Sequence, residues 1–173
     1  MCACFIYLFF IGISQHFCSD YQPNLVKNLR EFYKGHSPIL HSTGEQRRDF
    51  IYVDDLIDLC LKAQSADSFD IVNVSSQETI SINRIATIIA QIMHCEHINI
   101  KYAEAEDFWK KYPQLYSSPY PILPKLLEHE VLKYTCLSNK HAYDKYNWKP
   151  KTNIEDGLQK TVDFSCNVLK KNL

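Results

Sequence analysis

The sequence predicts an α/β fold in which short strands alternate with helices. Two runs rich in aromatic and β-branched residues, typical of strands, lie at 50–53 and 70–75. Each is followed by a segment with apolar residues at helical spacing, at 54–64 and at 81–93. Alternation of this kind is typical of parallel strands that are covered by the helices connecting them.

The length and composition of the chain suit one globular domain. Its 173 residues are 46% hydrophobic and 23% charged, enough to bury a core. The formal net charge of −1 supplies no general attraction for nucleic acid or for an acidic membrane, so neither is expected as a partner. The seven cysteines form no Cys-x-x-Cys pair. They predict reduced thiols in a cytoplasmic protein, not disulfides or a zinc site.

The first 13 residues are almost wholly apolar. They are too few for a membrane-spanning helix, which needs about 20 residues. A secretory signal fits the apolar length, but no lysine or arginine precedes the segment and no clear cleavage site follows it. We favour a buried parallel strand at 7–11. A secreted or membrane-tethered binding protein is the alternative.

Further elements follow from periodicity and from capping residues. We expect helices at 23–33 and from Asn153 onward, and strands at 37–42 and 98–102. Gly35 is a natural end for the first helix, and Ser81 and Asn153 can cap the helices that follow them. The helix at 54–64 is expected to bury five residues: Leu56, Ile57, Cys60, Leu61 and Ala63.

Between residues 104 and 134 the periodic pattern ends. The segment is aromatic and contains several prolines, which exclude a long continuous helix. An insert of this kind is commonly a binding loop or a lid, whose aromatic rings could stack on a base or a sugar. The alternative is that these rings pack the loop onto the domain.

The segment Gly44–Asp55 combines two arginines, a strand and two aspartates. Arg47 and Arg48 come just before the strand, where a guanidinium could bind phosphate through two hydrogen bonds. Asp54 or Asp55 can cap the next helix and complement its dipole. A pair of surface arginines beside a well-capped helix is the alternative interpretation.

The residues Arg48-Asp-Phe-Ile-Tyr-Val-Asp-Asp55 resemble a segment of the NAD-dependent epimerase/dehydratase family, extended short-chain dehydrogenase/reductases that modify nucleotide sugars. Two further stretches resemble the family in the same order, at 69–93 and 137–162. The resemblance implies the C-terminal part of a Rossmann-like α/β fold with few strands and an incomplete sheet. It also implies that residues 1–173 form a single truncated domain, the substrate-binding half of such an enzyme.

The resemblance implies particular site residues. Arg48 matches the arginine that contacts the diphosphate of the nucleotide sugar. Asn24 and Leu25 lie in a Pro-Asn-Leu segment similar to one that lines the nucleotide in relatives. Relatives usually add a basic residue shortly before the Ser-x-Lys segment, and His129 and Lys133 are the nearby options here. The cofactor implied for the full-length family is NAD(P).

Two elements that the family needs are missing from the sequence. The four glycines, at 12, 35, 44 and 157, are too far apart to form Gly-x-x-Gly-x-x-Gly, and no tyrosine has a lysine four residues later. We therefore expect the cofactor-binding half to be absent, predict no catalytic or cofactor-binding residue, and expect no activity from the chain alone. The alternative is a non-catalytic remnant, or a subunit that forms a dimer or associates with a partner supplying the cofactor half.

A metal site is not expected. His94, Cys95, Glu96 and His97 could mimic a metal-binding cluster, but they lie at a predicted helix end, where polar residues are common. Motifs for a serine nucleophile, a zinc protease or a phosphate-binding loop do not occur in the sequence.

Overall fold

The computed structural model describes residues 3–7, 10–11, 24–64, 69–104 and 133–171, with scattered residues between 106 and 129. The chain divides into two compact units. Unit 1 comprises Met1–Gln22, Arg48–Ile80 and Thr135–Leu173, and unit 2 comprises Pro23–Arg47 and Ser81–Tyr134. The prediction of a single domain over 1–173 stays a prediction, and each unit is described by itself.

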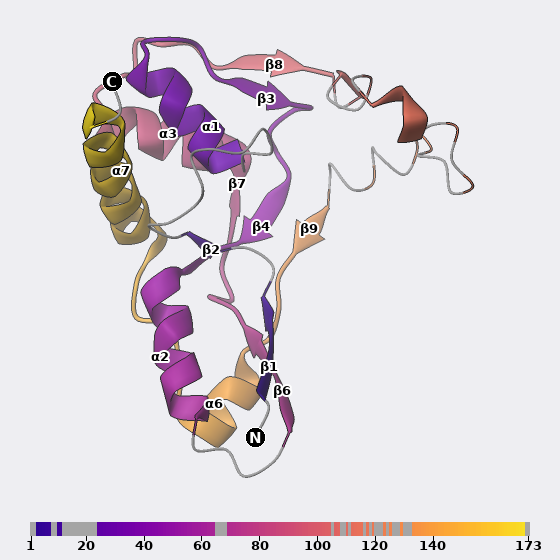
Figure 1. Ribbon diagram of the computed structural model, residues 1–173, viewed down its shortest axis with the longest axis vertical. Coiled ribbons are helices and arrows are strands. Elements are labelled where there is room, and N and C mark those ends of the chain that lie inside the picture. The colour runs from indigo at the N-terminus through magenta and orange to yellow at the C-terminus, as the bar shows by residue number, and fades with distance from the viewer. Residues whose placement is uncertain are drawn as a thin grey trace. The chain divides into compact units, whose positions relative to one another are not determined.

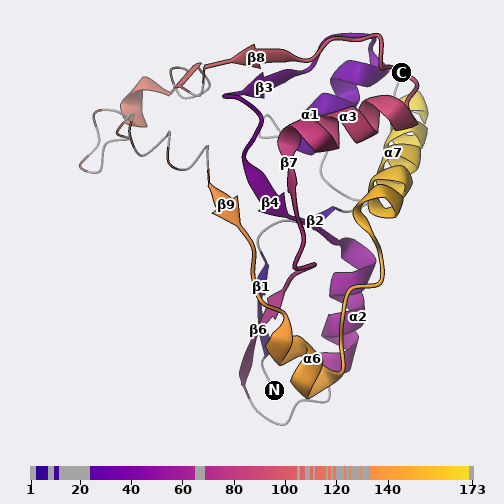
Figure 2. The same ribbon diagram turned by 180° about the vertical axis from the view of Figure 1, so that it is seen from behind.

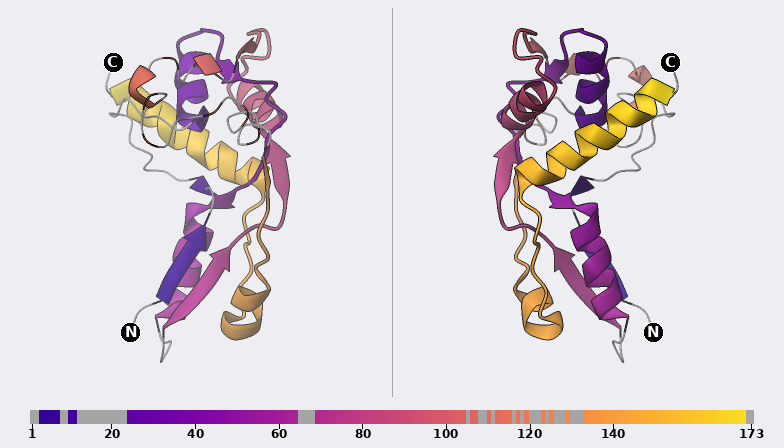
Figure 3. Two further views of the ribbon diagram at one scale, coloured as in Figure 1. Left: turned by 90° about the vertical axis from the view of Figure 1, so that its right-hand side faces the viewer. Right: turned by 90° about the vertical axis from the view of Figure 1, so that its left-hand side faces the viewer.

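The described residues of unit 1 include two pairs of parallel strands and three helices. Strand β1 (Ala3–Tyr7) pairs with β6 (Asp70–Val74), and β2 (Phe10–Ile11) pairs with β5 (Ile51–Tyr52). Figure 3 shows β1 and β6 running side by side in the same direction. The helices are α2 (Val53–Ala63), α6 (Lys140–Tyr146) and α7 (Ile154–Lys171) (Figure 1). Of the strand predicted at 7–11, Tyr7 is the last residue of β1 and Phe10–Ile11 form β2, and the predicted parallel pairing is confirmed for both.

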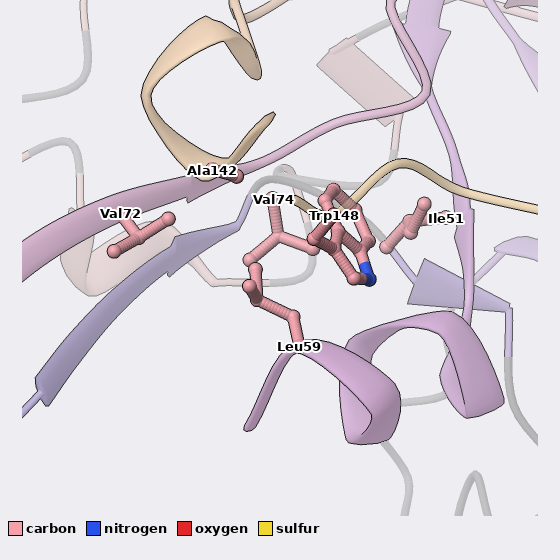
Figure 4. Close-up of a cluster of buried hydrophobic side chains, with 6 residues drawn as sticks. All are labelled: Ile51, Leu59, Val72, Val74, Ala142 and Trp148. Carbon is pink, nitrogen blue, oxygen red and sulfur yellow. The ribbon is translucent and has the colours of Figure 1, made fainter. Parts of the chain in front are cut away.

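The core of unit 1 forms where α2, α6 and the strands meet. Figure 4 shows the cluster, which consists of Ile51, Leu59, Val72, Val74, Ala142 and Trp148. Val72 and Val74 point the same way because they are two residues apart on one strand. Ile71, between Asp70 and Val72, is 51% exposed and lies on the opposite face of β6. Helices α2 and α6 thus cover one face of this sheet.

The described part of unit 2 includes the helices α1 (Asn24–Tyr33) and α3 (Ile82–Ile92) and a third pair of parallel strands. Helix α1 contacts α3, and β3 (Ile39–His41) pairs in parallel with β8 (Lys101–Ala103), as Figure 2 shows. A short 3₁₀ helix, η1, spans Pro113–Leu115. The buried apolar residues of these elements are Leu25, Leu29, Phe32, Leu40, Ile85, Ala86, Ile88, Ile89 and Ala90. Most of these buried residues belong to the apolar faces from which helices α1 and α3 were predicted.

The chain passes from one unit to the other within three short strands. They are β4 (Arg47–Asp49), β7 (Thr79–Ser81) and β9 (Tyr134–Thr135), and they form one sheet in the order β7–β4–β9. The middle strand β4 carries the arginine pair that the sequence singled out. Strands β7 and β9 were not predicted.

The predicted caps of two helices are confirmed. The Oγ atom of Ser81 accepts a hydrogen bond from the backbone N–H of Arg84 at 3.2 Å, and the Oδ1 atom of Asn153 accepts one from the N–H of Asp156 at 2.8 Å. Gly35 has a positive φ of 72° just after α1, as a helix-ending glycine does.

Two predictions about elements are wrong in detail. On α2, Ile57 and Leu61 are 49% and 66% exposed and Cys60 is exposed, because the buried stripe runs along Asp55, Leu59 and Ala63 instead. Strand β8 begins at Lys101, three residues after the predicted start, because the N–H of Ile98 donates to the carbonyl of Cys95 in a turn.

Most of the insert at 104–134, including the aromatic residues proposed for stacking at 108, 109, 116 and 120, lies outside the described residues. Among the described helices, none combines the length and the apolar character that crossing a membrane requires. The cytoplasmic location stays a prediction.

Candidate functional site

Arg48 is the middle residue of the middle strand in the β7–β4–β9 sheet. Along β4, Arg47 is exposed, Arg48 is half-buried and Asp49 is buried with 4% of its surface exposed. Because successive side chains of a strand point to opposite faces, the guanidinium of Arg48 extends from the face opposite to Asp49. The two neighbours therefore have different surroundings and can have different roles.

Asp49 fixes β4 to the turn that follows β6. Its Oδ1 atom accepts hydrogen bonds from the backbone N–H of Ser76 at 2.9 Å and from the hydroxyl of Ser76 at 2.6 Å. The hydroxyl of Ser75 donates to Oδ2. Hydrogen bonds to an ionised carboxylate are stronger than those between neutral groups. Asp49 thus holds the strand that carries Arg48, a role that the sequence analysis missed.

The same turn is joined to the segment before α6. The side-chain amide of Asn139 donates to the carbonyl of Ser75 at 3.1 Å. The Sγ atom of Cys136 lies 3.8 Å from Oδ2 of Asp49. Burial, and then the negative charge of Asp49, raise the pKa of the Cys136 thiol. A raised pKa makes the thiol harder to ionise than an ordinary cysteine.

Asp54 and Asp55 do not cap α2 through their side chains. The residue at the N-cap position is Tyr52, which makes no side-chain capping bond. Both aspartates lie in the first turn of the helix, where their charges complement its dipole. The capping prediction is therefore wrong, because the helix begins one residue earlier than predicted and places both carboxylates inside it.

Asp55 instead connects two distant parts of the chain. Its carboxylate is 4% exposed and accepts hydrogen bonds from the backbone N–H groups of Lys151, at 3.1 Å, and of Thr152, at 3.0 Å. The indole N–H of the fully buried Trp148 donates to the carbonyl oxygen of Asp55 at 3.0 Å. These contacts join the segment at 48–55 to the segment at 137–162, both of which resemble the family.

Asp70 makes a further connection, between β6 and α6. Its carboxylate accepts from the hydroxyl of Tyr146 at 2.6 Å and lies 2.9 Å from both the Nε2 atom of His141 and the Nζ atom of Lys145. The hydrogen bond from Tyr146, followed by those from His141 and Lys145, holds the pKa of Asp70 well below its usual range. All three donors come from one short helix, so the cluster fastens α6 to the strand.

The residues Asn24 and Leu25 lie at the start of α1 in unit 2. Leu25 is 8% exposed, so its side chain belongs mainly to the core of that unit. Arg48 belongs to unit 1. The roles of Arg48, Asn24 and Leu25 in binding remain predictions. His129 and Lys133 are both exposed.

The pyrophosphate of NAD binds at a glycine-rich turn between the end of a strand and the start of a helix. The glycines that the structure describes do not form such a turn. Gly35 follows a helix, and Gly157 lies inside α7, where an added Cβ would be 3.4 Å from the ring of Tyr52. Gly44 lies between two strands, and a Cβ added there would come within 2.0 Å of the side-chain oxygen of Asn83. These three residues therefore do not fit the cofactor.

The polar residues at 94–97 end helix α3. His94 has a positive φ of 55°, and its backbone N–H donates to the carbonyl of Gln91 at 3.1 Å. The N–H of Cys95 donates to the carbonyl of Ala90 at 2.8 Å, which closes the last turn. Within the described part of the chain, no three or more histidine, cysteine or acidic residues gather as a metal site.

Comparison with known proteins gives one family match. Residues 11–75 match the NAD dependent epimerase/dehydratase family. A curated relative, the UDP-glucuronate 4-epimerase of Thermodesulfobacterium geofontis (strain OPF15), is 26% identical over 127 residues, which cover 70% of this chain and 31% of that protein. The chain thus spans about a third of the length of this relative.

Solved structures share the fold. The UDP-glucose 4-epimerase of Thermotoga maritima, solved with UDP-glucose, is 18% identical with a TM-score of 0.76, covering 96% of this chain and 46% of that one. The UDP-N-acetylglucosamine 4-epimerase of Methanobrevibacter ruminantium M1, solved with UDP-N-acetylmuramic acid, is 23% identical with a TM-score of 0.73, covering 99% and 46%. At these identities the likeness establishes the fold alone.

The predicted fold class and the predicted resemblance are therefore both confirmed: residues 11–75 match the NAD-dependent epimerase/dehydratase family, and the chain matches the C-terminal part of the α/β fold of solved epimerases.

Proposed function

We propose that this chain provides the nucleotide-sugar-binding half of an NAD-dependent epimerase or dehydratase, with Arg48 holding the diphosphate. The observation that carries the proposal is the setting of Arg48. Its guanidinium is half-buried on a strand that Asp49 fixes from the opposite face. A guanidinium whose backbone is already ordered loses less entropy when it binds a ligand. The relatives solved with UDP-sugars support the same class of ligand.

Asn24 and Leu25 are the second part of the proposal. They begin α1, and the N–H groups in the first turn of a helix favour anions. A phosphate group is an ionised acceptor that suits a helix N-terminus. Since the side chain of Leu25 is buried, any contact that it makes with the ligand would involve its backbone.

No step of hydride or proton transfer is assigned to this chain. When NAD is bound by an enzyme of this family, it accepts and returns a hydride. The residues described in this chain provide no pyrophosphate-binding turn, and the sequence contains no Tyr-x-x-x-Lys pair. The proposed role is therefore binding and orientation of the substrate, with the chemistry supplied by a cofactor-binding half.

The test is calorimetric titration of the purified chain with UDP-, dTDP-, GDP- and CDP-sugars. We expect one of these to bind, and we expect Arg48→Ala to weaken its binding about 10- to 100-fold, as loss of hydrogen bonds to a charged group does. Arg47→Ala is the matched control, because Arg47 is the exposed neighbour on the same strand. Binding to none of the four ligands, or equal affinity of the Arg48→Ala variant, would contradict the proposal.

A second candidate function is a subunit that associates with a partner carrying the cofactor half. The observation that favours it is the sheet of β1 and β6, in which these two strands pair only with each other among the described residues. Ile71 is exposed on the face of β6 that α2 and α6 leave uncovered. Parallel sheets are normally larger and covered on both faces. Sedimentation of the chain as a stable monomer that unfolds cooperatively would exclude this function.

A further inference from the structure

The hydroxyl of Ser75, the first residue after β6, connects three segments of unit 1. The residue is 1% exposed. Its Oγ atom donates to the Oδ2 atom of Asp49 on β4, lies 2.6 Å from the carbonyl oxygen of Leu137, and accepts a hydrogen bond from the backbone N–H of Gln77 at 2.9 Å. A hydroxyl has one proton, so the two acceptors share this donor. All four residues belong to unit 1, so the network lies within one compact part of the chain.

The turn that begins at Ser75 holds the carboxylate of Asp49 by both of its oxygens. Ser75 donates to Oδ2, and the backbone N–H and the hydroxyl of Ser76 donate to Oδ1 at 2.9 and 2.6 Å. The carbonyl of Ser75 in turn accepts a hydrogen bond from the side-chain amide of Asn139 at 3.1 Å. Strand β4 is therefore connected, through this one serine, to a segment 64 residues further along the chain.

This network fixes the residue of β4 that follows Arg48. Successive side chains of a strand point to opposite faces, so a carboxylate held on one face sets the direction in which its neighbour leaves the other face. Arg48 is half-buried on this strand. An arginine whose backbone is already ordered loses less conformational entropy when it binds a ligand. Release of Asp49 would therefore weaken binding by Arg48 without removing a contact with the ligand.

A serine hydroxyl beside a carboxylate is also the arrangement of a nucleophile and its base. Ser75 does not fit that role, because a nucleophile must be accessible to its substrate and this residue is almost fully buried. Its oxygen also accepts the hydrogen bond from Gln77, and its proton faces two acceptors of the chain itself. An effect of Ser75 on a ligand must therefore act through Asp49.

We propose that Ser75 is a positioning residue for the nucleotide-sugar site: through Asp49, its hydroxyl holds β4 in the conformation in which Arg48 binds the diphosphate. This inference rests on the proposed function and deepens it, because it names the residue that preorganises the arginine. Ser75 itself makes no contact with the nucleotide sugar.

The alternative is that Ser75 only stabilises the turn after β6. Both roles predict that Ser75→Ala unfolds at a lower temperature, since the variant removes a donor that Asp49 and Leu137 share. The two roles differ in how the effect on binding depends on Arg48. A positioning role predicts that the loss of affinity disappears once Arg48 has been removed. A general loosening of unit 1 weakens binding whether or not Arg48 is present.

The experiment is a double-mutant cycle, measured by calorimetric titration with UDP-glucose well below the Tm of each protein. It compares the native chain, Ser75→Ala, Arg48→Ala and the double variant. We expect Ser75→Ala to weaken binding about 3- to 10-fold in the native background and to have no effect in the Arg48→Ala background, as coupled residues do. Binding of uridine, which has no phosphate, should be the same for the native chain and Ser75→Ala.

The matched control is Asn73→Ala. Asn73 also lies on β6, and its amide donates to the carbonyl of Ser138 at 3.2 Å, so it joins the strand to the segment before α6 through a hydrogen bond that does not involve Asp49. This variant should bind UDP-glucose with the native affinity. If Ser75→Ala does not fold, Ser75→Cys keeps the size of the side chain and a weak donor. It then takes the place of Ser75→Ala in the cycle, with the same pattern and a smaller loss expected.

The outcomes separate this proposal from the function on which it rests. Native affinity in the folded Ser75 variant, or an equal loss in both backgrounds, would overturn the role of Ser75 and leave the proposed function standing. An equal loss in Asn73→Ala would do the same. Absence of UDP-glucose binding by the native chain would overturn this inference, and the titrations with dTDP-, GDP- and CDP-sugars would then decide the proposed function alone. A loss confined to proteins that contain Arg48 would support both.

Discussion

Asp55 in unit 1 and Asn28 in unit 2 are both polar, both lie on a helix and both are almost fully buried. They differ in their partners. The carboxylate of Asp55 accepts two backbone hydrogen bonds, while the amide nitrogen of Asn28 has no partner. A buried polar group that the chain itself satisfies stabilises the fold, whereas one that the chain leaves unsatisfied costs free energy in the folded state.

The same distinction applies within the segment that resembles the family. In Arg48–Asp55, the two buried aspartates bond to other parts of unit 1, and they account for the structural role of the segment. Arg48 is half-buried on strand β4, which the hydrogen bonds of Asp49 fix to the turn after β6. The segment that resembles the family therefore contains residues that stabilise the fold and one residue, Arg48, that we propose to bind the diphosphate.

The largest effect is expected from Trp148→Ala, which removes the fully buried ring at the centre of the unit 1 core. Loss of a buried aromatic side chain costs about 3–5 kcal/mol of unfolding free energy. Denaturant titration measures this change. Trp148→Phe keeps the ring packing but loses the N–H bond to Asp55, so it should cost much less. Equal costs for the two variants would show that the hydrogen bond, not the packing, stabilises this region.

A smaller effect is expected from Asp55→Ala. It leaves the N–H groups of Lys151 and Thr152 without their acceptor, and hydrogen bonds to a charged group contribute about 1.5–3 kcal/mol. Asp54→Ala is the control, because Asp54 is the exposed neighbour in the same helical turn. Equal changes in unfolding free energy would reduce the role of Asp55 to an effect on the helix dipole and would remove the contrast with Asn28.

The smallest effect at neutral pH is expected from Asp70→Asn, and it should depend on pH. The hydrogen bond from Tyr146, followed by those from His141 and Lys145, lowers the pKa of Asp70 in the folded chain. In the unfolded chain an aspartate has a pKa of about 3.9. Folding therefore gains stability from Asp70 above this value, and the gain declines as the pH falls toward the folded pKa.

Thermal unfolding of native and Asp70→Asn chains from pH 7 to pH 3 measures this dependence. The difference in Tm should be constant at higher pH and should shrink below about pH 4. Asp144→Asn is a control on the same helix, where the exposed Asp144 contacts only Lys140 among the hydrogen bonds described. A Tm difference for Asp70→Asn that does not change with pH would contradict the role assigned to the carboxylate.

Local patterns in the sequence were sufficient to predict most elements. The alternation of strands and helices, the caps at Ser81 and Asn153 and the end of α1 at Gly35 all depend on residues near in sequence. The resemblance to the family also predicted that the segments at 48–55, 69–93 and 137–162 belong to one fold. These features could be predicted because propensity, capping and periodicity are properties of short stretches.

The features that the sequence did not reveal depend on contacts between distant residues. Apolar spacing could not show that Ile57 and Leu61 would be exposed, since this depends on which side of α2 the strands and α6 occupy. The roles of Asp49 and Asp55 depend on partners 27 and 96 residues away. Asn28 has an ordinary position in an amphipathic helix, and only its burial without a partner distinguishes it.

The bonds from Asp55 to Lys151 and Thr152 also affect the order in which the chain can fold. Unit 1 is assembled from three segments, and its last segment begins at Thr135. During synthesis, the carboxylate of Asp55 and the pocket for Trp148 stay incomplete until the residues near 150 have been made. Contacts of this sequence separation form slowly, because a long loop must close first. Unit 1 therefore completes its folding only after these residues have been made, and its apolar core stays incomplete until then.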